Sequence, residues 1–246
     1  MKIIALYSIK GGVGKTAAAV NLAHLAAEDR AATLLCDLDP QGAASYYCRV
    51  EPGKELNRKK LLKGGKRLDE QIQKSDFPGL DLLPADFSFR NLDLALEEMG
   101  SKERLKEIFK PFKEQYDYIF LDCPPNLTRV SENVFAAADL LLVPCIPTTL
   151  AMMTLEKLLA FFAAKKIPTD KLRAFLSMVE GRKTMHQEFV RMAAASPALF
   201  LEGMIPFLAE VEKMGLHRAP VTSFQPGSRA AAAYRDLWAE IKERAL

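Results

Sequence analysis

The chain has few of the residues that cross-link a protein or bind structural metals. It has four cysteines in 246 residues, and no two of them form a Cys-x-x-Cys pair. Three of them, Cys36, Cys123 and Cys145, lie in apolar runs, where a thiol usually acts as a small hydrophobe. We therefore expect neither a disulfide framework nor a zinc site.

Long apolar runs and a charge excess are also missing. No apolar run approaches the ~18–20 residues of a transmembrane helix, and the apolar N-terminus is too short for a signal peptide. We expect a cytoplasmic protein. Lys and Arg number 34 against 31 Asp and Glu, a net charge of +3. This balance excludes an overall basic coat for nucleic acid and an acidic disordered chain, but it does not exclude a local basic patch.

Short apolar runs alternate with helical patterns along the whole chain. The expected strands are Lys2–Ser8, Thr33–Asp37, Leu80–Leu83, Tyr118–Asp122, Leu140–Pro144, Leu172–Val179 and a short one near Met204–Ile205. The expected helices cover residues 16–29, 88–98, 101–114, 151–165, 184–195 and 229–245. This alternation predicts an α/β fold with a mostly parallel, doubly wound sheet. We expect one domain over residues 1–246, with no N-terminal helix-turn-helix domain and with 49–79 as a surface excursion.

A glycine-rich loop separates the first strand from the first helix. It reads Lys10-Gly11-Gly12-Val13-Gly14-Lys15-Thr16, followed by Ala17. Such a loop turns backbone N–H groups toward phosphate oxygens at a helix N-terminus, where Lys15 can reach the phosphates and Thr16 can ligate Mg²⁺. The usual pattern has glycine where this chain has Ile9, and the loop carries a second lysine, Lys10.

Two more carboxylate segments end apolar strands. The second strand ends in Asp37-Leu38-Asp39-Pro40-Gln41-Gly42, and Asp122 ends the strand before Cys123-Pro124-Pro125. These positions fall at the carboxyl edge of the predicted sheet, where open α/β sheets bind ligands. Asp122 has the pattern of a Walker-B acid that holds Mg²⁺ directly or through water. The residues alone do not assign separate roles to Asp37 and Asp39.

These three segments together resemble the ParA/MinD family of deviant-Walker P-loop ATPases, most closely its ParA/Soj-type partitioning members. The resemblance implies an ATP- and Mg²⁺-dependent, slow, partner-stimulated ATP hydrolase that forms an ATP-sandwiched homodimer. Lys10 matches the signature lysine that reaches the partner's nucleotide, Lys15 the P-loop lysine and Asp39 the switch I aspartate. We therefore expect catalytic roles for Lys10, Lys15 and Asp39. Thr16 and Asp122 are the expected metal-site residues.

The resemblance also identifies the flexible and base-contacting segments. Switch II falls at Asn126 through Asn133, and Thr128 stands where the family commonly has glycine, which predicts a stiffer switch. The segment Ile205-Pro206-Phe207 lies near the adenine in related proteins. The expected nucleotide-binding residues are Lys10, Gly11, Gly12, Val13, Gly14, Lys15, Thr16, Ala17, Pro206 and Phe207.

Family members differ in what the dimer binds, and two basic segments favour nonspecific DNA. Residues 51–74 hold eight Lys and Arg against four acids, and residues 165–191 hold seven against three. Each segment has a net charge of +4, so the rest of the chain is net −5, and the near-neutral total hides a local asymmetry. Phosphate neutralisation by such clusters gives sequence-independent, salt-sensitive binding. Solvated surfaces remain the alternative for each segment.

The arginines that often follow Ile-Pro in the family are missing here. DNA contacts are then expected at Arg182, Lys183, Lys213, Arg218 and Arg229. The resemblance further implies a ParB-like or cargo-linked activator and association with the nucleoid. It does not identify the cargo, which could be a chromosome, a plasmid or a protein assembly.

Three other functions remain as alternatives. A MinD-like membrane ATPase would need a C-terminal amphipathic helix with a basic polar face. The last helix carries Leu237, Trp238 and Ile241 at helical spacing but has a balanced polar face, so we expect it to pack on the sheet and membrane binding to be absent. An iron–sulfur carrier would need cysteine pairs that this chain lacks, and a metabolic synthetase would not need Lys10.

Overall fold

A single eight-stranded sheet forms the centre of the protein, which the computed structural model describes over residues 1–246. The strands are β1 (Lys2–Leu6), β2 (Thr33–Asp37), β3 (Gln73–Lys74), β4 (Leu80–Leu83), β5 (Tyr118–Asp122), β6 (Leu140–Cys145), β7 (Leu172–Val179) and β8 (Ile205–Pro206). Their order across the sheet is β3-β4-β2-β5-β1-β6-β7-β8. All neighbours are parallel except β3 and β4. The predicted mostly parallel α/β fold is confirmed.

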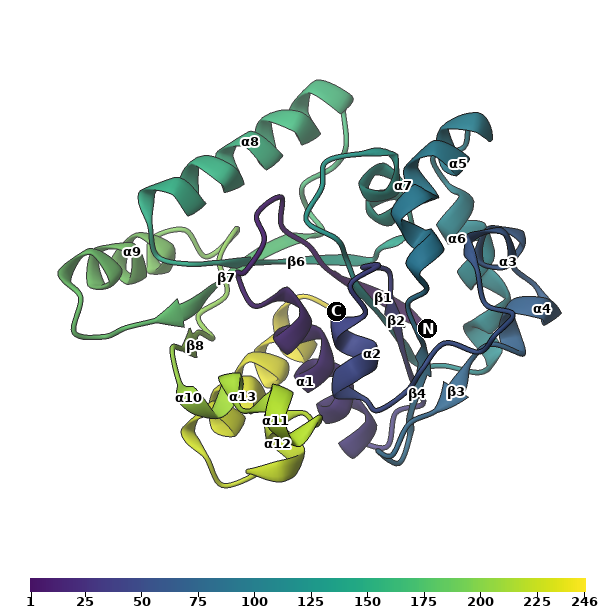
Figure 1. Cartoon of the computed structure of the whole chain (residues 1–246). Helices are drawn as coiled ribbons and strands as arrows, with labels where there is room; N and C mark the ends of the chain where they lie inside the picture. Colours follow the sequence, from purple (N-terminus) through teal and green to yellow (C-terminus); the bar gives the residue numbers. More distant parts are fainter.

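Helices cover both faces of the sheet (Figure 1). One face carries α1 (Lys15–Glu28), α2 (Ala43–Tyr47), α10 (Ala209–Glu212), α11 (Met214–His217), α12 (Val221–Phe224) and α13 (Arg229–Arg244). The other carries α3 (Arg58–Lys63), α4 (Lys66–Asp69), α5 (Leu92–Glu98), α6 (Arg104–Phe109), α7 (Arg129–Ala137), α8 (Thr149–Lys165) and α9 (Thr184–Ala194). Two 3₁₀ helices, η1 (Phe87–Asn91) and η2 (Lys110–Glu114), complete the chain.

The alternation of side chains along β1 explains why there are two cores. Ile3 and Ala5 belong to the core beneath α5–α9, whereas Ile4 and Leu6 belong to the core with α1 and α13. All four side chains are buried. Because successive residues of a strand point to opposite faces, a strand covered on both sides has to be apolar throughout.

The segment 49–79 is more than the expected surface excursion. It contains α3, α4 and β3, and Leu56, Leu61 and Leu68 are buried in the core beneath α5–α9. No helix was predicted in this segment, because each of its two helices is only four to six residues long. Such short elements give no sustained helical period in the sequence.

The C-terminal helix packs on the sheet, as expected. Leu237, Trp238 and Ile241 are buried against α1 and the strands, and the indole of Trp238 donates a hydrogen bond to Asp29 at 2.9 Å. The apolar stripe of α13 is therefore fully used within the fold. No helix of the chain combines the length and the apolar composition needed to cross a bilayer.

The two basic segments lie at opposite ends of the molecule. Residues 51–74 include α3, α4 and β3, at one edge of the sheet, whereas residues 165–191 include β7 and α9, near the other edge. Figure 1 shows α3 and α4 on one side and α9 on the other. The two segments therefore do not form one basic face within a single chain.

Candidate functional site

The glycine-rich loop lies between the end of β1 and the start of α1. Gly12 and Gly14 adopt positive φ angles of 71° and 90°, which glycine reaches without steric cost. The N–H groups of residues 11–14 donate to no protein acceptor. Unpaired donors at the N-terminus of a 14-residue helix form an anion site suited to phosphate.

Lys15 lies against this loop. Its side chain is buried, and its ammonium group donates to the carbonyl of Lys10 at 3.2 Å. Burial lowers the pKa of Lys15, and the charges of Asp122 and Asp39 act in the opposite direction. Lys10 itself is exposed at the start of the loop. The two lysines therefore differ in position: one faces into the fold and the other faces outward.

Asp122 and Asp37 end neighbouring strands in direct register, and both are fully buried. Neither carboxylate oxygen of Asp122 has a hydrogen-bond partner. Burial raises the pKa of Asp122 well above its usual range, the charge of Asp37 adds to this, and Thr16 and Lys15 oppose it. A buried carboxylate without partners is costly unless a cation neutralises it. Asp122 together with the hydroxyl of Thr16 therefore fits the donor set of a Mg²⁺ site.

Asp37 has a different environment from Asp122. It accepts hydrogen bonds from the amide of Ser45 at 2.8 Å, the hydroxyl of Ser45 at 2.7 Å and the amide of Asp39 at 3.2 Å. Burial nevertheless raises the pKa of Asp37 to about 6. The hydroxyl of Ser45 also accepts from the amide of Ala85 at 2.9 Å. Asp37 thus holds the start of α2 and the loop after β4 together.

Asp39 is the half-buried carboxylate of this turn. One of its oxygens accepts from the amide of Gln41 at 3.0 Å, and the turn closes with the amide of Gly42 donating to the carbonyl of Asp39 at 2.9 Å. The structure therefore separates the two carboxylates that the sequence could not distinguish. Asp37 is committed to the backbone, and Asp39 retains a free oxygen near the loop.

Tyr7, which follows β1, restrains the segment after Asp122. The hydroxyl of Tyr7 donates to the carbonyl of Asn126 at 2.8 Å, and its ring packs edge-on against Phe135 with centroids 4.8 Å apart. Thr128 is extended, with φ −136°, as the N-cap residue of α7. No glycine is required at this angle, so threonine fits the backbone without strain.

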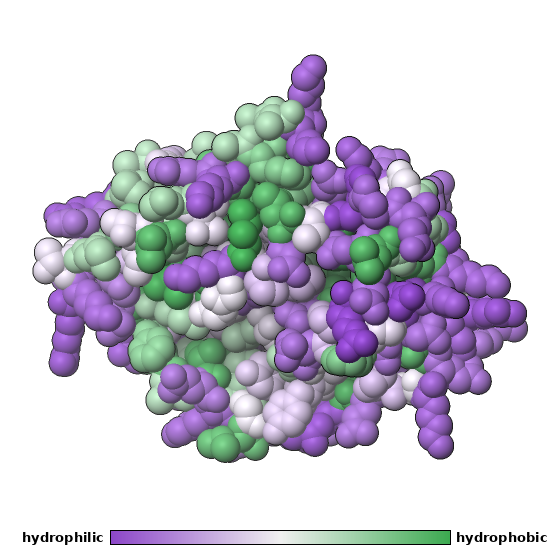
Figure 2. Space-filling view, turned by 45° about the horizontal axis from the view of Figure 1, so that its top comes forward, coloured by the Kyte–Doolittle hydropathy of each residue, from purple (hydrophilic) through white to green (hydrophobic).

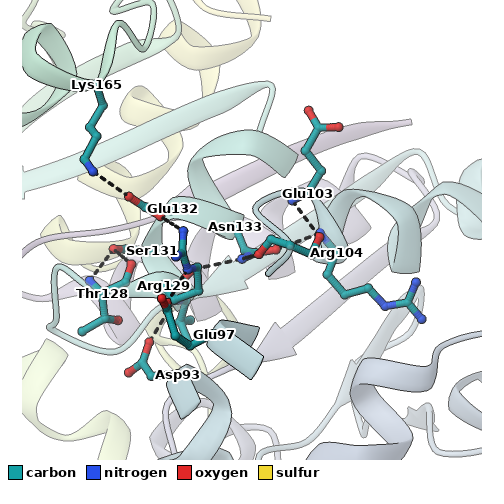
Figure 3. A network of polar contacts seen from close by, with 12 residues as sticks. Asp93, Glu97, Glu103, Arg104, Thr128, Arg129, Ser131, Glu132, Asn133 and Lys165 are labelled. Atoms are coloured by element: carbon teal, nitrogen blue, oxygen red, sulfur yellow. Dashed lines mark hydrogen bonds and ion pairs between the residues drawn. The ribbon is translucent and has the colours of Figure 1, made fainter. Parts of the chain in front are cut away.

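Side chains from two neighbouring helices hold the first turn of α7 (Figure 3). Arg129 pairs with Glu97 of α5 at 2.7 Å and with Glu132 of its own helix, and Lys165 of α8 approaches Glu132 at 3.5 Å. The amide of Val130 donates to the carboxylate of Asp93 at 2.9 Å. Each surface pair contributes little alone, but together they restrict how far α7 can move.

Asn133 secures the same helix to α6. Its side-chain oxygen accepts from the amide of Arg104 at 2.8 Å, and its nitrogen donates to the carbonyl of Ser101 at 3.0 Å. Asn133 is fully buried, so these bonds are shielded from water. The range Asn126–Asn133 therefore consists of a loop, residues 126–128, and a well-anchored helical turn.

The opposite end of the loop meets β7. A Cβ atom on Gly14 would lie 2.9 Å from the hydroxyl of Ser177, and Met178 adopts a positive φ of 56° at a bulge between Ser177 and Val179. The amide of Phe207 donates to the carbonyl of Val179 at 3.0 Å, and the Phe207 ring is exposed. Pro206 at the end of β8 pairs with Val179 of β7, and Phe207 follows it. A base attached to loop-bound phosphates could pack on this side.

Sequence reasoning missed several residues of this site. Ser177 and Met178 contact the position of Gly14, Ser45 bridges β2 to the loop after β4, and Tyr7 supports Asn126. Nothing in the run Leu172–Val179 indicates a bulge.

The five DNA-contact candidates differ in how their side chains are engaged. Lys183 pairs with Glu180, Arg218 donates to the carbonyl of Tyr46 and covers its ring at 4.6 Å, and Arg229 lines a groove of about 740 Å³ between β8 and α13. Arg182 and Lys213 make no ion pair. Of the five, Lys183 and Arg218 are thus engaged within the chain, whereas Arg182 and Lys213 have no partner.

Sequence comparison identifies relatives along the whole chain. A family model described as an AAA domain matches residues 1–174. A "ParA family protein" of Chlamydia muridarum is 31% identical over 98% of this chain and 97% of its own length. The "Sporulation initiation inhibitor protein Soj" of Bacillus subtilis is 30% identical and covers 98% of both chains.

Structural comparison gives the same fold in proteins of different function. A putative plasmid partition protein of Borrelia burgdorferi B31 bound to AMPPNP superposes with a TM-score of 0.82, 23% identity and coverage of 99% of this chain and 98% of that one. Cobyrinic acid a,c-diamide synthase of Mycobacterium smegmatis, bound to an ATP analogue and magnesium, superposes with a TM-score of 0.81 and 24% identity. The match covers 99% of this chain and 95% of that one. The fold alone therefore does not separate partitioning from synthesis.

Proposed function

The chain belongs to the ParA family of P-loop ATPases, and from this membership we propose that it is a dimerising ATPase that partitions or positions DNA or another large cargo. In this proposal the protein binds ATP and Mg²⁺, dimerises, and binds nonspecific DNA in its ATP state. A ParB-like or cargo-linked partner then stimulates hydrolysis and releases the dimer from DNA. The protein is therefore on the nucleoid in its ATP state and off it after hydrolysis.

The observation that carries this proposal is the carboxylate of Asp122. It is fully buried, neither oxygen is hydrogen-bonded, and it ends β5, which pairs with β1, the strand that leads into the glycine-rich loop. An isolated buried charge of this kind is retained where a cation or a proton completes it. When bound, Mg²⁺ would be held by Thr16 and Asp122 and would neutralise charge on the β- and γ-phosphates.

The chain's own residues supply the rest of the chemistry. The free N–H groups of residues 11–14 and the ammonium of Lys15 bind and orient the phosphates. Asp39 keeps one oxygen free beside them to position the attacking water, while Asp37 fixes the turn that carries it. Pro206 and Phe207 bound the side on which the base lies.

Lys10 gives a reason for dimerisation to depend on ATP. It is exposed at the rim of the loop and forms no ion pair, so it is free to contact a phosphate held by a second copy. In this arrangement each γ-phosphate has a lysine from both chains, and hydrolysis removes the group that bridges them. The dimer then persists only as long as the bound ATP remains unhydrolysed.

Light scattering and DNA binding, measured with the same nucleotides, test the proposal. We expect a monomer with ADP and a dimer with Mg²⁺ and a non-hydrolysable ATP analogue. We expect mobility shifts of an unrelated duplex only with the analogue, and a loss of shifts as salt rises. EDTA should abolish both effects.

Two results would contradict the proposal in different ways. A monomer under every nucleotide condition would contradict ATP-dependent dimerisation. An ATP-bound dimer that fails to bind DNA at low salt would contradict DNA as the cargo. Flotation with liposomes, run beside the mobility shifts, tests the MinD-like alternative. We expect no flotation, because the apolar stripe of α13 is buried.

A further inference from the structure

Residues 54–67 carry a concentration of unpaired positive charge. Six cations in this stretch form no ion pair and donate no side-chain hydrogen bond: Lys54, Arg58, Lys59, Lys63, Lys66 and Arg67. Five of them are exposed, and Arg58 is half-exposed. We call them the α3–α4 cations. The one lysine of the stretch that is neutralised is Lys60, which pairs with Glu55.

The second basic segment has the same formal charge but fewer free cations. Of its seven Lys and Arg, Lys165 and Lys183 pair with carboxylates, and Lys171 and Arg173 donate to backbone carbonyls. Only three remain free: Lys166, Arg182 and Arg191. Formal charge counted along the sequence therefore overstates this segment, because most of its cations are used to hold the fold together.

The α3–α4 surface is also fixed in shape. The side chain of Asn57 caps α3 by accepting from the amides of Lys59 and Lys60 at 3.0 and 3.1 Å. Arg104 of α6 donates to the carbonyls of Leu62 and Lys63 at 2.7 and 3.1 Å. A preorganised surface loses less conformational entropy when it binds a ligand.

Beside α3 the surface is hollowed and strongly basic. The hollow has a volume of about 340 Å³ and is lined by three of the α3–α4 cations together with Arg104, Glu98 and three apolar residues. Figure 2 shows hydrophilic side chains covering the edge of the molecule where α3 and α4 lie in Figure 1. No large apolar side chain of residues 51–74 is exposed.

We propose that the α3–α4 cations bind the phosphate backbone of DNA. Protein partners usually anchor through a cluster of buried aromatic and apolar side chains, but the hollow exposes one large apolar side chain, Met99, among four Lys and Arg. Backbone phosphates, in contrast, are bound by Lys and Arg without regard to sequence. This inference rests on the proposed function and assigns its DNA contact to α3 and α4. Of the five C-terminal candidates, in contrast, Lys183 and Arg218 are already engaged.

A charge-removal variant tests the assignment. It replaces four exposed cations with alanine: Lys59, Lys63, Lys66 and Arg67. DNA binding is measured with Mg²⁺ and a non-hydrolysable ATP analogue over a range of salt concentrations. Each lost phosphate contact should make the slope of log K against log salt shallower by about 0.9, so four contacts give about 3.6. Affinity at fixed moderate salt should fall by about tenfold or more.

The matched control removes the same charge elsewhere. It replaces four exposed lysines that form no ion pair and lie outside the segment: Lys2, Lys102, Lys110 and Lys157. Both variants have the same net charge, so a loss caused only by total charge would appear in both. We expect the control to keep the wild-type slope. Both variants should still dimerise with the ATP analogue, which shows that the fold is intact.

The outcomes separate the two levels of the proposal. If the wild type binds DNA and the α3–α4 variant matches the control in slope and affinity, the assignment is overturned while the proposed function stands. If the same loss follows instead from replacing Arg182, Lys213 and Arg229, the contact lies at the C-terminal candidates. If the wild-type dimer binds no DNA, the proposed DNA cargo fails, and the assignment fails with it.

Discussion

Replacing Asp122 with asparagine should stabilise the nucleotide-free protein. The carboxylate is fully buried and neither oxygen is hydrogen-bonded, so asparagine of nearly the same shape removes a buried charge whose cost Lys15 and Thr16 only partly offset. The substitution also removes the like charge facing Asp37. A buried polar group left without a hydrogen-bond partner costs about 1–3 kcal/mol, which sets the scale of the expected gain.

The size of the effect should depend on pH with a defined sign. The folded-state pKa of Asp122 is raised, so ionisation costs folding stability above the unfolded pKa, and the cost grows until pH passes the raised value. The variant should therefore match the wild type near pH 4 and exceed it at pH 8 by about 1–3 kcal/mol, the cost of an unsatisfied buried polar group. For a chain of 246 residues, this means a Tm higher by roughly 2–12 °C.

Calorimetry with and without Mg²⁺ and an ATP analogue completes the test. Ligand at 100 times its Kd stabilises the wild type by about 2.7 kcal/mol, and the variant should lose most of this, so the stability gap should narrow or disappear. Asp37→Asn is the matched control, because Asp37 is equally buried but accepts three hydrogen bonds, and it should gain less. A nucleotide-free Asp122→Asn protein that is less stable than the wild type at pH 8 would refute the reasoning.

Three further substitutions separate the roles of the loop and the first switch. Lys10→Ala should keep much of its nucleotide binding but lose ATP-dependent dimers in light scattering; dimers that persist would exclude a bridging role. Asp39→Ala should keep ATP-bound dimers while phosphate release stops. Continued ATP turnover would show that another residue positions the attacking water. Gly14→Ala should weaken nucleotide binding in calorimetry, because its Cβ would lie 2.9 Å from Ser177 at φ +90°. Gly12→Ala, with nothing within 4 Å, isolates the backbone strain and should lose less.

The central strands were predictable because their residues are apolar on both faces. Thr33–Asp37, Leu80–Leu83, Tyr118–Asp122 and Leu172–Val179 match the structure at both ends. The order of the strands in the sheet and the presence of β3 could not be predicted from the sequence. β3 has two residues, and its pairing depends on β4, a contact that local periodicity does not contain.

The candidate site was predictable where a motif fixes the chemistry and unpredictable where distant residues meet. The loop and Asp122 follow from local sequence. The distinction between Asp37 and Asp39 does not, because it depends on Ser45 and on the register with β5. Whether a carboxylate is free or committed depends on the partners that the fold brings to it, here Ser45 of α2.

The helix α7 shows why a stiff or flexible switch cannot be inferred from one residue. The sequence pointed to Thr128, where glycine is common in the family, and the structure gives this residue an extended backbone that needs no glycine. The restraint lies instead in Arg129 and Asn133, which connect α7 to α5 and α6 (Figure 3). These contacts leave residues 123–128 as the part of the segment without side-chain ties to neighbouring helices. Within that stretch, the hydrogen bond from the Tyr7 hydroxyl to the Asn126 carbonyl and the reciprocal bonds between Thr128 and Ser131 are the side-chain restraints on the backbone.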